Sequence, residues 1–574
     1  MRSPIALVPA WIRHYPRQHL RDDVLAGLIV AVLVVPQSLA YALLAGLPPQ
    51  MGLYVSIVPV VVYALVGSSN TQSMGPVAIT AIMTAAVLAP LASPGTPQYV
   101  TLAATLALMS GAMVLAFGLL RLGFLSQLLS RPVVSGFISG SAALIILSQC
   151  KFLLGIAVPS GPSWTVLWNL LQGLPDAHGP TVVLAAGAMG ILALSRSALG
   201  RVLVAAGLPR PVADMVGRIM PLGVVATSTA LVVGLGLDTQ HGVAVVGPVP
   251  DGLAGASWFW PGWAEVQLLA GPAMVLAFIG MVQNITMAQA LAIRRHERLD
   301  ANRELVGLGA SNVAAAFYGG MPVGGGMSRT AINVAAGAQT PLASIVTGVT
   351  MLGVVWAGSH WFAHLPLAVL AATIAVAAFS MIDLKALRQA WGYDRADALA
   401  LLGTALGVLV LGLQVGIVLG IALSLATLLL RASTPHIAVI GRIAGTEHFR
   451  NVERHGVETL PGVLLLRIDE SLFFGNLNAV EARLSAELQA APDTHDVVLI
   501  MSAVNRVDTT AMEVLTDLQR DLAARGIRLH LAEVKGPVQD RLMRTPLWPA
   551  LEGRVHLSVN AAFEQLSPPS RPTP

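Results

Sequence analysis

Long apolar segments separated by short polar connections run from Val24 to Arg431. The first begins near Val24, and the others lie at roughly 51–67, 76–90, 101–120, 132–149, 180–195, 219–237, 267–292, 304–318, 327–337, 342–357, 365–381, 397–412 and 413–431. Several are near or below the roughly 20 residues that a helix needs to cross a bilayer. Hydrophobic residues make up 55% of the 574-residue chain and charged residues 11%, too apolar for a soluble protein of this length. The pattern predicts a polytopic α-helical membrane protein with about fourteen segments in the lipid bilayer.

The pattern changes near Pro435, where charged residues become frequent and apolar runs shorten to strand length. Strand-like runs at 463–468, 496–501 and 527–532 alternate with helical patterns at 476–488 and 509–525, which predicts a soluble α/β domain. We therefore expect a cytoplasmic N-terminal segment (1–23), a transmembrane domain (24–431), a linker (432–434), the α/β domain (435–568) and a flexible tail (569–574).

Basic residues indicate the orientation of the segments. With the N-terminus inside, the clusters of Arg and Lys between segments fall on the cytoplasmic side, and only Lys151 falls outside. The connection from Asp238 to Glu265 carries acids and tryptophans but no Lys or Arg, which is typical of an external loop. An even number of segments then places the α/β domain in the cytoplasm, and we expect the protein in the inner (plasma) membrane. The net charge of +4 reflects arginines in short loops and gives no argument for nucleic-acid binding.

Two apolar segments begin at helix-breaking residues. The third starts at Gly75-Pro76, and the tenth follows the glycine run from Gly319 to Gly326. Each is the third of seven, which is the pattern of inverted repeats whose half-helices meet at a site near the membrane midplane. The alternative is that the glycines only permit close helix packing. Arg329 favours a site, because an arginine at membrane depth needs a polar cavity or a partner and no carboxylate lies near it in sequence. Helix N-termini and a guanidinium both carry positive charge, so together they predict an anion-binding site.

Seven motifs stand out along the chain: Pro36–Pro49, Gly52–Tyr54, Gly67–Ser69, Gly75–Ala78, Asp300–Leu305, Gly319–Pro322 and Ser328–Asn333. They resemble the motifs of the SulP family of anion transporters, the sulfate permeases and anion exchangers. The resemblance runs from about Trp11 to Phe563 with the motifs in family order, which makes it highly specific. It implies fourteen segments in seven-plus-seven inverted repeats with half-helices 3 and 10, a core that moves against a gate, a cytoplasmic STAS domain and a homodimer.

The resemblance also implies which residues bind the anion. Gln37 and Tyr41 match the side chains that the family's first segment contributes to the pocket, although ordinary interhelical packing would account for them equally well. Val77 and Ala78 match the start of the third segment. The start of the tenth segment corresponds to Met327, Ser328 and Arg329. Backbone amides and a serine hydroxyl can coordinate an oxyanion, while Arg329 supplies charge.

The eighth segment departs from the family pattern. Many prokaryotic members that resemble cation-coupled carriers have an acidic residue where this chain has Gln283. Gln283, Asn284 and Thr286 can still line the cavity with neutral dipoles. Carboxylates such as Asp23 and Glu304 are expected in loops or at segment ends, so we expect no membrane-buried proton carrier. Exchange or uniport is favoured, and symport through an acid at a segment end, such as Asp22, stays open.

The C-terminal domain resembles STAS domains through Leu472–Asn476 and Val507–Ala511. In small regulatory STAS proteins this second loop holds a phosphorylated hydroxyl, which makes Thr510 a regulatory candidate. The simpler hypothesis is that Asp508 caps the following helix. The chain has no Walker loop and no convincing catalytic arrangement of Ser or Cys with His and an acid, so we expect no enzyme, and we predict no cofactor and no metal site.

The residues and the resemblance together predict a secondary transporter of a small inorganic or organic anion that works by alternating access. Sulfate is the first expectation, on family resemblance alone. Bicarbonate, a C4-dicarboxylate, chloride and nitrate stay open as substrates. A nucleobase permease of the same general fold is less favoured, since the eighth segment lacks an acid. A different class of function is a regulatory scaffold that binds anions and signals through its STAS domain without flux.

Overall fold

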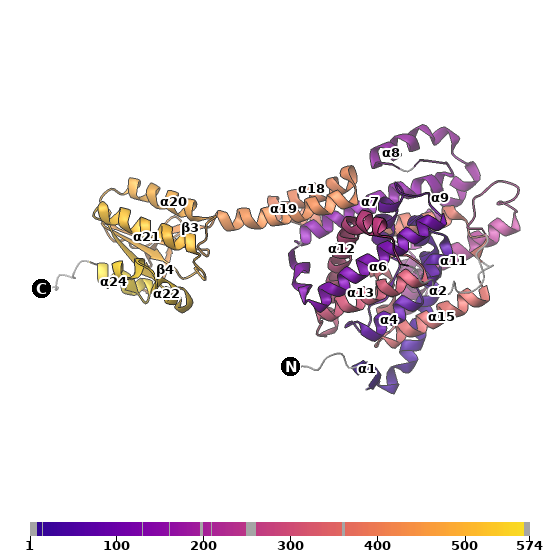
Figure 1. The fold of residues 1–574 in the computed structure, drawn as a ribbon, viewed down its shortest axis with the longest axis horizontal. Coiled ribbons are helices and arrows are strands. Elements are labelled where there is room, and N and C mark those ends of the chain that lie inside the picture. The colour runs from indigo at the N-terminus through magenta and orange to yellow at the C-terminus, as the bar shows by residue number, and fades with distance from the viewer. Residues whose placement is uncertain are drawn as a thin grey trace. The chain divides into compact units, whose positions relative to one another are not determined.

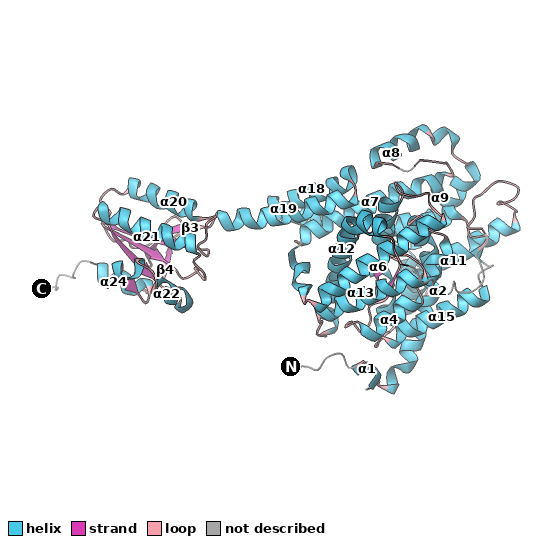
Figure 2. Cartoon of the chain, in the orientation of Figure 1, coloured by secondary structure: helices cyan, strands magenta, loops and turns pink. Residues whose placement is uncertain are grey.

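The chain forms two compact units, Met1–Ser424 and Leu425–Pro574. The computed structural model describes residues 9–13, 15–128, 130–159, 161–195, 199–207, 209–247, 260–358 and 362–567. The first unit, here the membrane unit, is helical apart from a two-stranded ladder, and the C-terminal unit contains a six-stranded sheet (Figures 1 and 2). The division falls inside the last apolar helix, and the domain boundary expected near Arg431 stays a prediction.

Helices of the membrane unit follow the apolar segments of the sequence. The main ones are α2 (Leu20–Leu44), α3 (Pro49–Tyr54), α4 (Val58–Val66), α5 (Ala78–Leu88), α6 (Pro97–Leu119), α7 (Arg131–Leu154), α8 (Ser163–Gln172), α9 (Gly179–Leu194), α11 (Arg210–Gly234), α12 (Trp263–Arg295), α13 (Ala301–Tyr318), α14 (Met327–Ala335), α15 (Leu342–Gly358), α16 (Leu367–Phe379), α17 (Leu384–Tyr393), α18 (Arg395–Leu411) and α19 (Leu413–Ser433). Within the described residues, seven helical stretches are long and apolar enough to cross a membrane, and four further apolar helices are shorter.

Two groups of helices pack separately within the membrane unit. In the first, here the core group, α13 packs extensively on α6 and α4, α12 packs on α6, and α15 packs on α2. In the second, here the gate group, α7 packs on α18 and α16, and α9 packs on α16. Glycines allow the close approaches: a Cβ on Gly309 of α13 would lie 2.5 Å from the backbone nitrogen of Leu115 in α6. A Cβ on Gly136 of α7 would lie 2.2 Å from the carbonyl oxygen of Leu401 in α18.

The C-terminal unit is an α/β domain with strand order β4-β3-β5-β6-β7-β8. Its elements are β3 (Ile437–Arg442), β4 (Phe449–Asn451), β5 (Val463–Ile468), α20 (Leu477–Ala490), β6 (Asp496–Ile500), α21 (Thr509–Ala524), β7 (Arg528–Ala532), α22 (Gly536–Leu542), α23 (Leu547–Ala550), β8 (Val555–His556) and α24 (Val559–Leu566). β5 to β8 are parallel, and β3 pairs antiparallel with β4 and β5. One apolar core contains α20 and α21 and the other contains α24, so both faces of the sheet are covered. The three strands and two helices that the sequence predicts here are confirmed to within about two residues.

Candidate anion-binding site

The two interrupted segments meet at a short antiparallel ladder in the core group. β1 (Met74–Gly75) pairs with β2 (Gly324–Gly325), with Met74 opposite Gly325 and Gly75 opposite Gly324. α5 begins three residues after β1, and α14 begins two residues after β2. The first N–H groups of a helix have no partner within the helix itself. In α5 and α14 no side chain caps these groups either. Two positive helix ends therefore start from one ladder, as the sequence predicted.

Arg329 lies in the first turn of α14 and is 1% exposed. Its Nη1 donates to the carbonyl oxygen of Met74 at 2.6 Å, and its Nη2 lies 3.5 Å from the hydroxyl of Ser38 in α2. Its Nε is buried without a hydrogen-bond partner. Among the described residues no carboxylate forms an ion pair with this guanidinium. A buried positive charge without a counterion is costly, so the site favours an anionic ligand.

The segment from Thr71 to Gly75 is held by one face of α14. The amide of Asn333 donates to the carbonyl oxygen of Thr71 at 2.8 Å, and the backbone N–H of Ser73 donates to the hydroxyl of Thr330 at 3.1 Å. Together with the bond from Arg329 to Met74, these contacts tie the chain before α5 to the first turns of α14. The two helix N-termini are therefore fixed to each other by side chains as well as by the ladder.

The first long helix, α2, brings its predicted residues to the same region. The Nε2 of Gln37 donates to the hydroxyl of Tyr41 at 3.0 Å, one turn away. The hydroxyl of Ser38 lies 2.8 Å from that of Ser56 as well as facing Arg329. The sequence did not single out Ser38 as a site residue, although Ser38 lies between Gln37 and Tyr41 in the motif Pro36–Pro49.

The remaining predicted residues have different surroundings. Val77 is the N-cap of α5 and Ala78 is its first residue. Met327 and Ser328 begin α14, but the placement of their side chains lies outside the described structure. On α12, Gln283 is half-buried and Thr286 is exposed, whereas Asn284 is buried and hydrogen-bonded to Gln72 and Glu304. The binding and cavity roles of all these residues stay predictions.

Two carboxylates of the membrane unit are buried at the N-terminal ends of their helices. Glu304 and Asp23 are both 0% exposed, although each lies in the first turn of its helix. Asp23 accepts hydrogen bonds from the backbone N–H groups of Gln339 and Thr340, at 2.8 and 3.0 Å. It also accepts from the hydroxyls of Thr340 and Tyr15, at 2.7 and 2.9 Å. Both acids lie at helix ends, as expected from the sequence, and the absence of a membrane-buried proton carrier stays a prediction.

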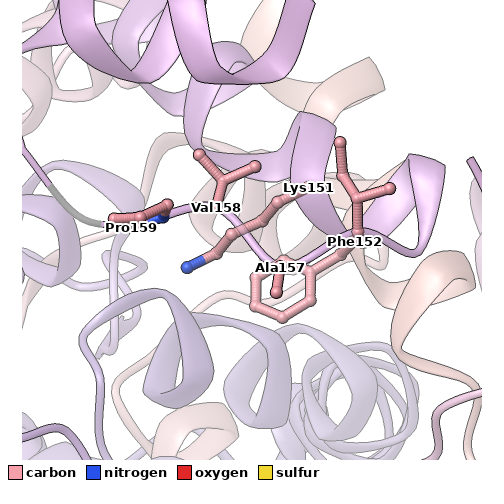
Figure 3. A pocket seen from close by; sticks show the side chains of 6 residues that line it. Lys151, Phe152, Ala157, Val158 and Pro159 are labelled. Atoms are coloured by element: carbon pink, nitrogen blue, oxygen red, sulfur yellow. The ribbon is translucent and has the colours of Figure 1, made fainter. Parts of the chain in front are cut away.

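A separate cavity of about 470 Å³ lies beside Lys151 at the C-terminal end of α7 (Figure 3). It is lined by Lys151, Phe152 and the residues from Ile156 to Pro159. The amine of Lys151 lies 5.0 Å from the ring centroid of Phe152. None of these residues belongs to the ladder or to α14. The cavity is therefore separate from the predicted anion-binding site.

The predicted capping role of Asp508 is observed in the C-terminal unit. Its carboxylate accepts from the backbone N–H of Ala511 at 2.8 Å, at the N-terminus of α21. It also accepts from the backbone N–H of Phe474 at 3.0 Å and so joins two loops. Thr510 is exposed in the first turn of α21, and its regulatory role stays a prediction.

The fold and the site define a class of protein. A helical membrane bundle in which two discontinuous helices start at one buried ladder has the architecture of a secondary transporter. Comparison with known proteins then gives the family. Residues 20–404 match the model of the sulfate permease family, and residues 456–562 match the STAS domain. The chain belongs to the sulfate permease family, whose members are transporters and not enzymes, and it carries a C-terminal STAS domain.

Similar proteins extend along nearly the whole chain. A probable sulfate transporter of Mycobacterium tuberculosis (strain CDC 1551 / Oshkosh) is 35% identical over 538 residues, 93% of either chain. Probable sulfate transporter 4.2 of Arabidopsis thaliana is 32% identical over 91% of this chain and 77% of its own. The structure of the murine anion transporter Slc26a9 in its inward-facing state matches with a TM-score of 0.85 and 22% identity, covering 98% of this chain and 95% of that one. The transmembrane domain of a cyanobacterial bicarbonate transporter, BicA, matches 70% of this chain and 98% of its own, with a TM-score of 0.61 and 23% identity.

Proposed function

We propose that this member of the family is a secondary active transporter of an inorganic anion, with sulfate as its main substrate. The anion binds between the N-termini of α5 and α14, next to Gln37 and Tyr41 of α2. One observation carries the proposal: the guanidinium of Arg329 is buried beside two helix N-termini and has no carboxylate partner among the described residues. The similarity to proteins named as sulfate transporters supports the choice of anion.

Transport follows an alternating-access cycle in which the core group moves against the gate group. The separate packing of the two groups supports this, because α2 contacts α11 and α16 far less than it contacts its own group. On the eighth segment, Gln283 stands where many prokaryotic members that resemble cation-coupled carriers have an acid, so exchange or uniport is the proposed mode. The proposed setting is a homodimer in the inner membrane, with the N-terminus and the STAS domain cytoplasmic.

Uptake into proteoliposomes tests the proposal. Purified protein should take up radiolabelled sulfate without a requirement for a pH or sodium gradient, and unlabelled bicarbonate, chloride, nitrate and a C4-dicarboxylate should compete less well than sulfate. A wild-type protein that binds sulfate but gives no flux would instead support the scaffold hypothesis. A preference for another of these anions would replace sulfate as the substrate and leave the site in place.

Arg329→Ala should weaken sulfate binding by about 1–3 kcal/mol, since it removes one charge-assisted interaction from a buried site. The measurement is the KM for uptake together with sulfate-dependent thermal stabilisation of the detergent-solubilised protein. Arg388→Ala is the matched control, because Arg388 is an exposed arginine on α17. Unchanged sulfate affinity in a well-folded Arg329→Ala protein would contradict the proposed site.

A further inference from the structure

Glu304 is a fully buried carboxylate in the core group that the proposed transport cycle does not use. Its Oε2 accepts from the backbone N–H and the hydroxyl of Ser68, at 3.2 and 2.7 Å. Its Oε1 accepts from the amide of Asn284 at 3.0 Å and from the hydroxyl of Tyr63. Four donors from α4, from the loop after it and from α12 therefore surround one side chain of α13. These four donors occupy both oxygens of the carboxylate.

Close backbone packing brings Glu304 to these donors. Gly307, one turn along α13, faces Gly67 at the C-terminal end of α4, and a Cβ on Gly307 would lie 2.7 Å from the Cα of Gly67. The first turn of α13 therefore lies directly against the loop that contains Ser68. Any larger residue at Gly307 would separate the carboxylate from that loop.

Both oxygens of Glu304 accept hydrogen bonds, and this fixes the orientation of two amides. Asn284 must present its Nδ2 to Glu304, so its Oδ1 faces the opposite way. That oxygen accepts from the Nε2 of Gln72 at 2.6 Å. The Oε1 of Gln72 is then left on the side of the Tyr63 hydroxyl, 3.4 Å away. The acceptor oxygen of Glu304 thus determines which way each amide in the chain from Glu304 to Gln72 points.

The oriented amides lie directly against the ladder. A Cβ on Gly325 of β2 would lie 2.0 Å from the Nε2 of Gln72 and 2.6 Å from the Oδ1 of Asn284. Gln72 is also two residues before Met74, whose carbonyl oxygen holds Arg329. The segment from Thr71 to Gly75 is therefore fixed on one side by α14 and on the other by the amides that Glu304 orients.

We propose that Glu304 is a positioning residue for the anion site, acting through Asn284 and Gln72 on the ladder from which α5 and α14 start. The inference rests on the proposed function of that site. Glu304 does not touch the anion. Its carboxylate holds the Thr71 to Gly75 segment in the geometry that places the Met74 carbonyl, and with it the Arg329 guanidinium, beside the helix N-termini.

Glu304→Gln tests the proposal with an almost isosteric change. The introduced amide carries an NH₂ group, which must face either the N–H of Ser68 or the amide of Asn284. In either position two donors then face each other, unless the amide of Asn284 rotates to present its oxygen. We expect the KM for sulfate uptake to rise about tenfold, with a smaller change in the maximal rate. Sulfate-dependent thermal stabilisation should weaken in parallel. Glu265→Gln, the same chemical change in the first turn of α12, should leave the KM unchanged.

A double-mutant cycle separates positioning from a general loss of stability. Gln72→Ala should raise the KM by a similar factor, and Glu304→Gln combined with Gln72→Ala should raise it no further than either change alone, because both interrupt one chain of contacts. A double variant whose KM rises by the product of the two single-variant factors would overturn the proposal. So would an unchanged KM in folded Glu304→Gln. If Glu304→Gln does not fold, Gln72→Ala decides alone, and an unchanged KM there overturns the positioning role.

The same assays distinguish this inference from the proposed function. Wild-type protein that takes up none of the anions tested would remove the proposed function and the inference with it. Wild-type uptake that depends on Arg329 but not on Glu304 or Gln72 would remove only the inference.

Discussion

At the scale of single residues, the place of the Arg329 guanidinium requires that residue 75 is a glycine. A Cβ on Gly75 would lie 1.5 Å from the Nη1 of Arg329, and Gly75 has a φ of 154° that L side chains rarely adopt. The guanidinium therefore occupies the space where another residue would have a side chain. This explains in physical terms why a glycine precedes Pro76 at the start of the third segment.

Gly75→Ala should displace the Arg329 guanidinium and weaken sulfate binding by about 1–3 kcal/mol, the range expected for losing one charge-assisted interaction. The KM for uptake and the sulfate-dependent rise in unfolding temperature both report this loss. Gly187→Ala on α9 is the control, since a Cβ there has no heavy atom within 4 Å. Equal sulfate affinity of Gly75→Ala and wild type would show that the guanidinium is not needed where it lies.

The sequence identified Arg329 but missed Glu304 as a buried group, for one physical reason. An arginine within an apolar run is conspicuous at any depth, because its charge contrasts with its neighbours in sequence. Glu304 follows Asp300 and Arg303 and so looks like part of a solvated helix start. Its burial depends on the approach of Gly307 to Gly67, a contact between residues far apart in the chain that no local pattern contains.

At the scale of elements, α13 holds the strand β2 as well as the chain before β1. Asn312 donates to the carbonyl oxygen of Val323 at 2.9 Å and accepts from its backbone N–H at 2.9 Å. Glu304, two turns earlier, acts on Gln72 through Asn284. One continuous helix therefore supports both interrupted segments, which makes α13 the element that positions the site.

The capping role of Asp508 predicts a local effect on the C-terminal unit. Asp508→Ala should lower the stability of that unit by about 1 kcal/mol, because α21 loses its cap, and should leave sulfate transport in the folded protein unchanged. Hydrogen exchange of α21 in the full-length protein measures the first effect and proteoliposome uptake the second. Asp517→Ala removes an exposed acid from the same helix as a control. Loss of transport with normal exchange would contradict the capping account.

A buried histidine pair makes the stability of the C-terminal unit depend on pH. His530 and His556 lie with Nδ1 and Nε2 at 3.0 Å, and the Nε2 of His530 lies 2.9 Å from the carboxylate of Asp496. Burial lowers the pKa of His530 below its ordinary 6.5, and burial and the neighbouring His530 lower the pKa of His556. The unfolded chain therefore takes up these protons more readily than the folded one. The stabilisation is fully present above pH 6.5 and declines as the pH falls below it.

Hydrogen exchange of β7 and β8 in the full-length protein checks this pH dependence, after correction for intrinsic exchange rates. Protection should fall between pH 7.5 and pH 5.5, and His556→Asn should reduce the pH dependence. His455→Asn changes an exposed histidine and should behave as wild type. Protection that rises or stays constant toward pH 5.5 would contradict the sign derived from the two pKa shifts.

At the scale of the whole molecule, the pattern of apolar and charged residues was enough to predict the two units and their order along the chain. Apolar periodicity and the charge change near Pro435 predicted a membrane unit followed by an α/β domain, and the glycine-containing breaks at Gly75 and Gly326 predicted where α5 and α14 begin. The packing into a core group and a gate group, in contrast, entered only through family resemblance. Helix periodicity shows that a segment is apolar but not which other helix it contacts.

The location of the bound anion tests the central claim most directly. Selenate has the charge and shape of sulfate, and its selenium can be located by anomalous diffraction from crystals of the full-length protein grown with selenate. The account predicts a selenium peak within hydrogen-bonding distance of the first backbone amides of both α5 and α14, on the side of Tyr41. A selenate peak elsewhere, or no peak between these helices in a protein whose sulfate uptake selenate inhibits, would contradict it.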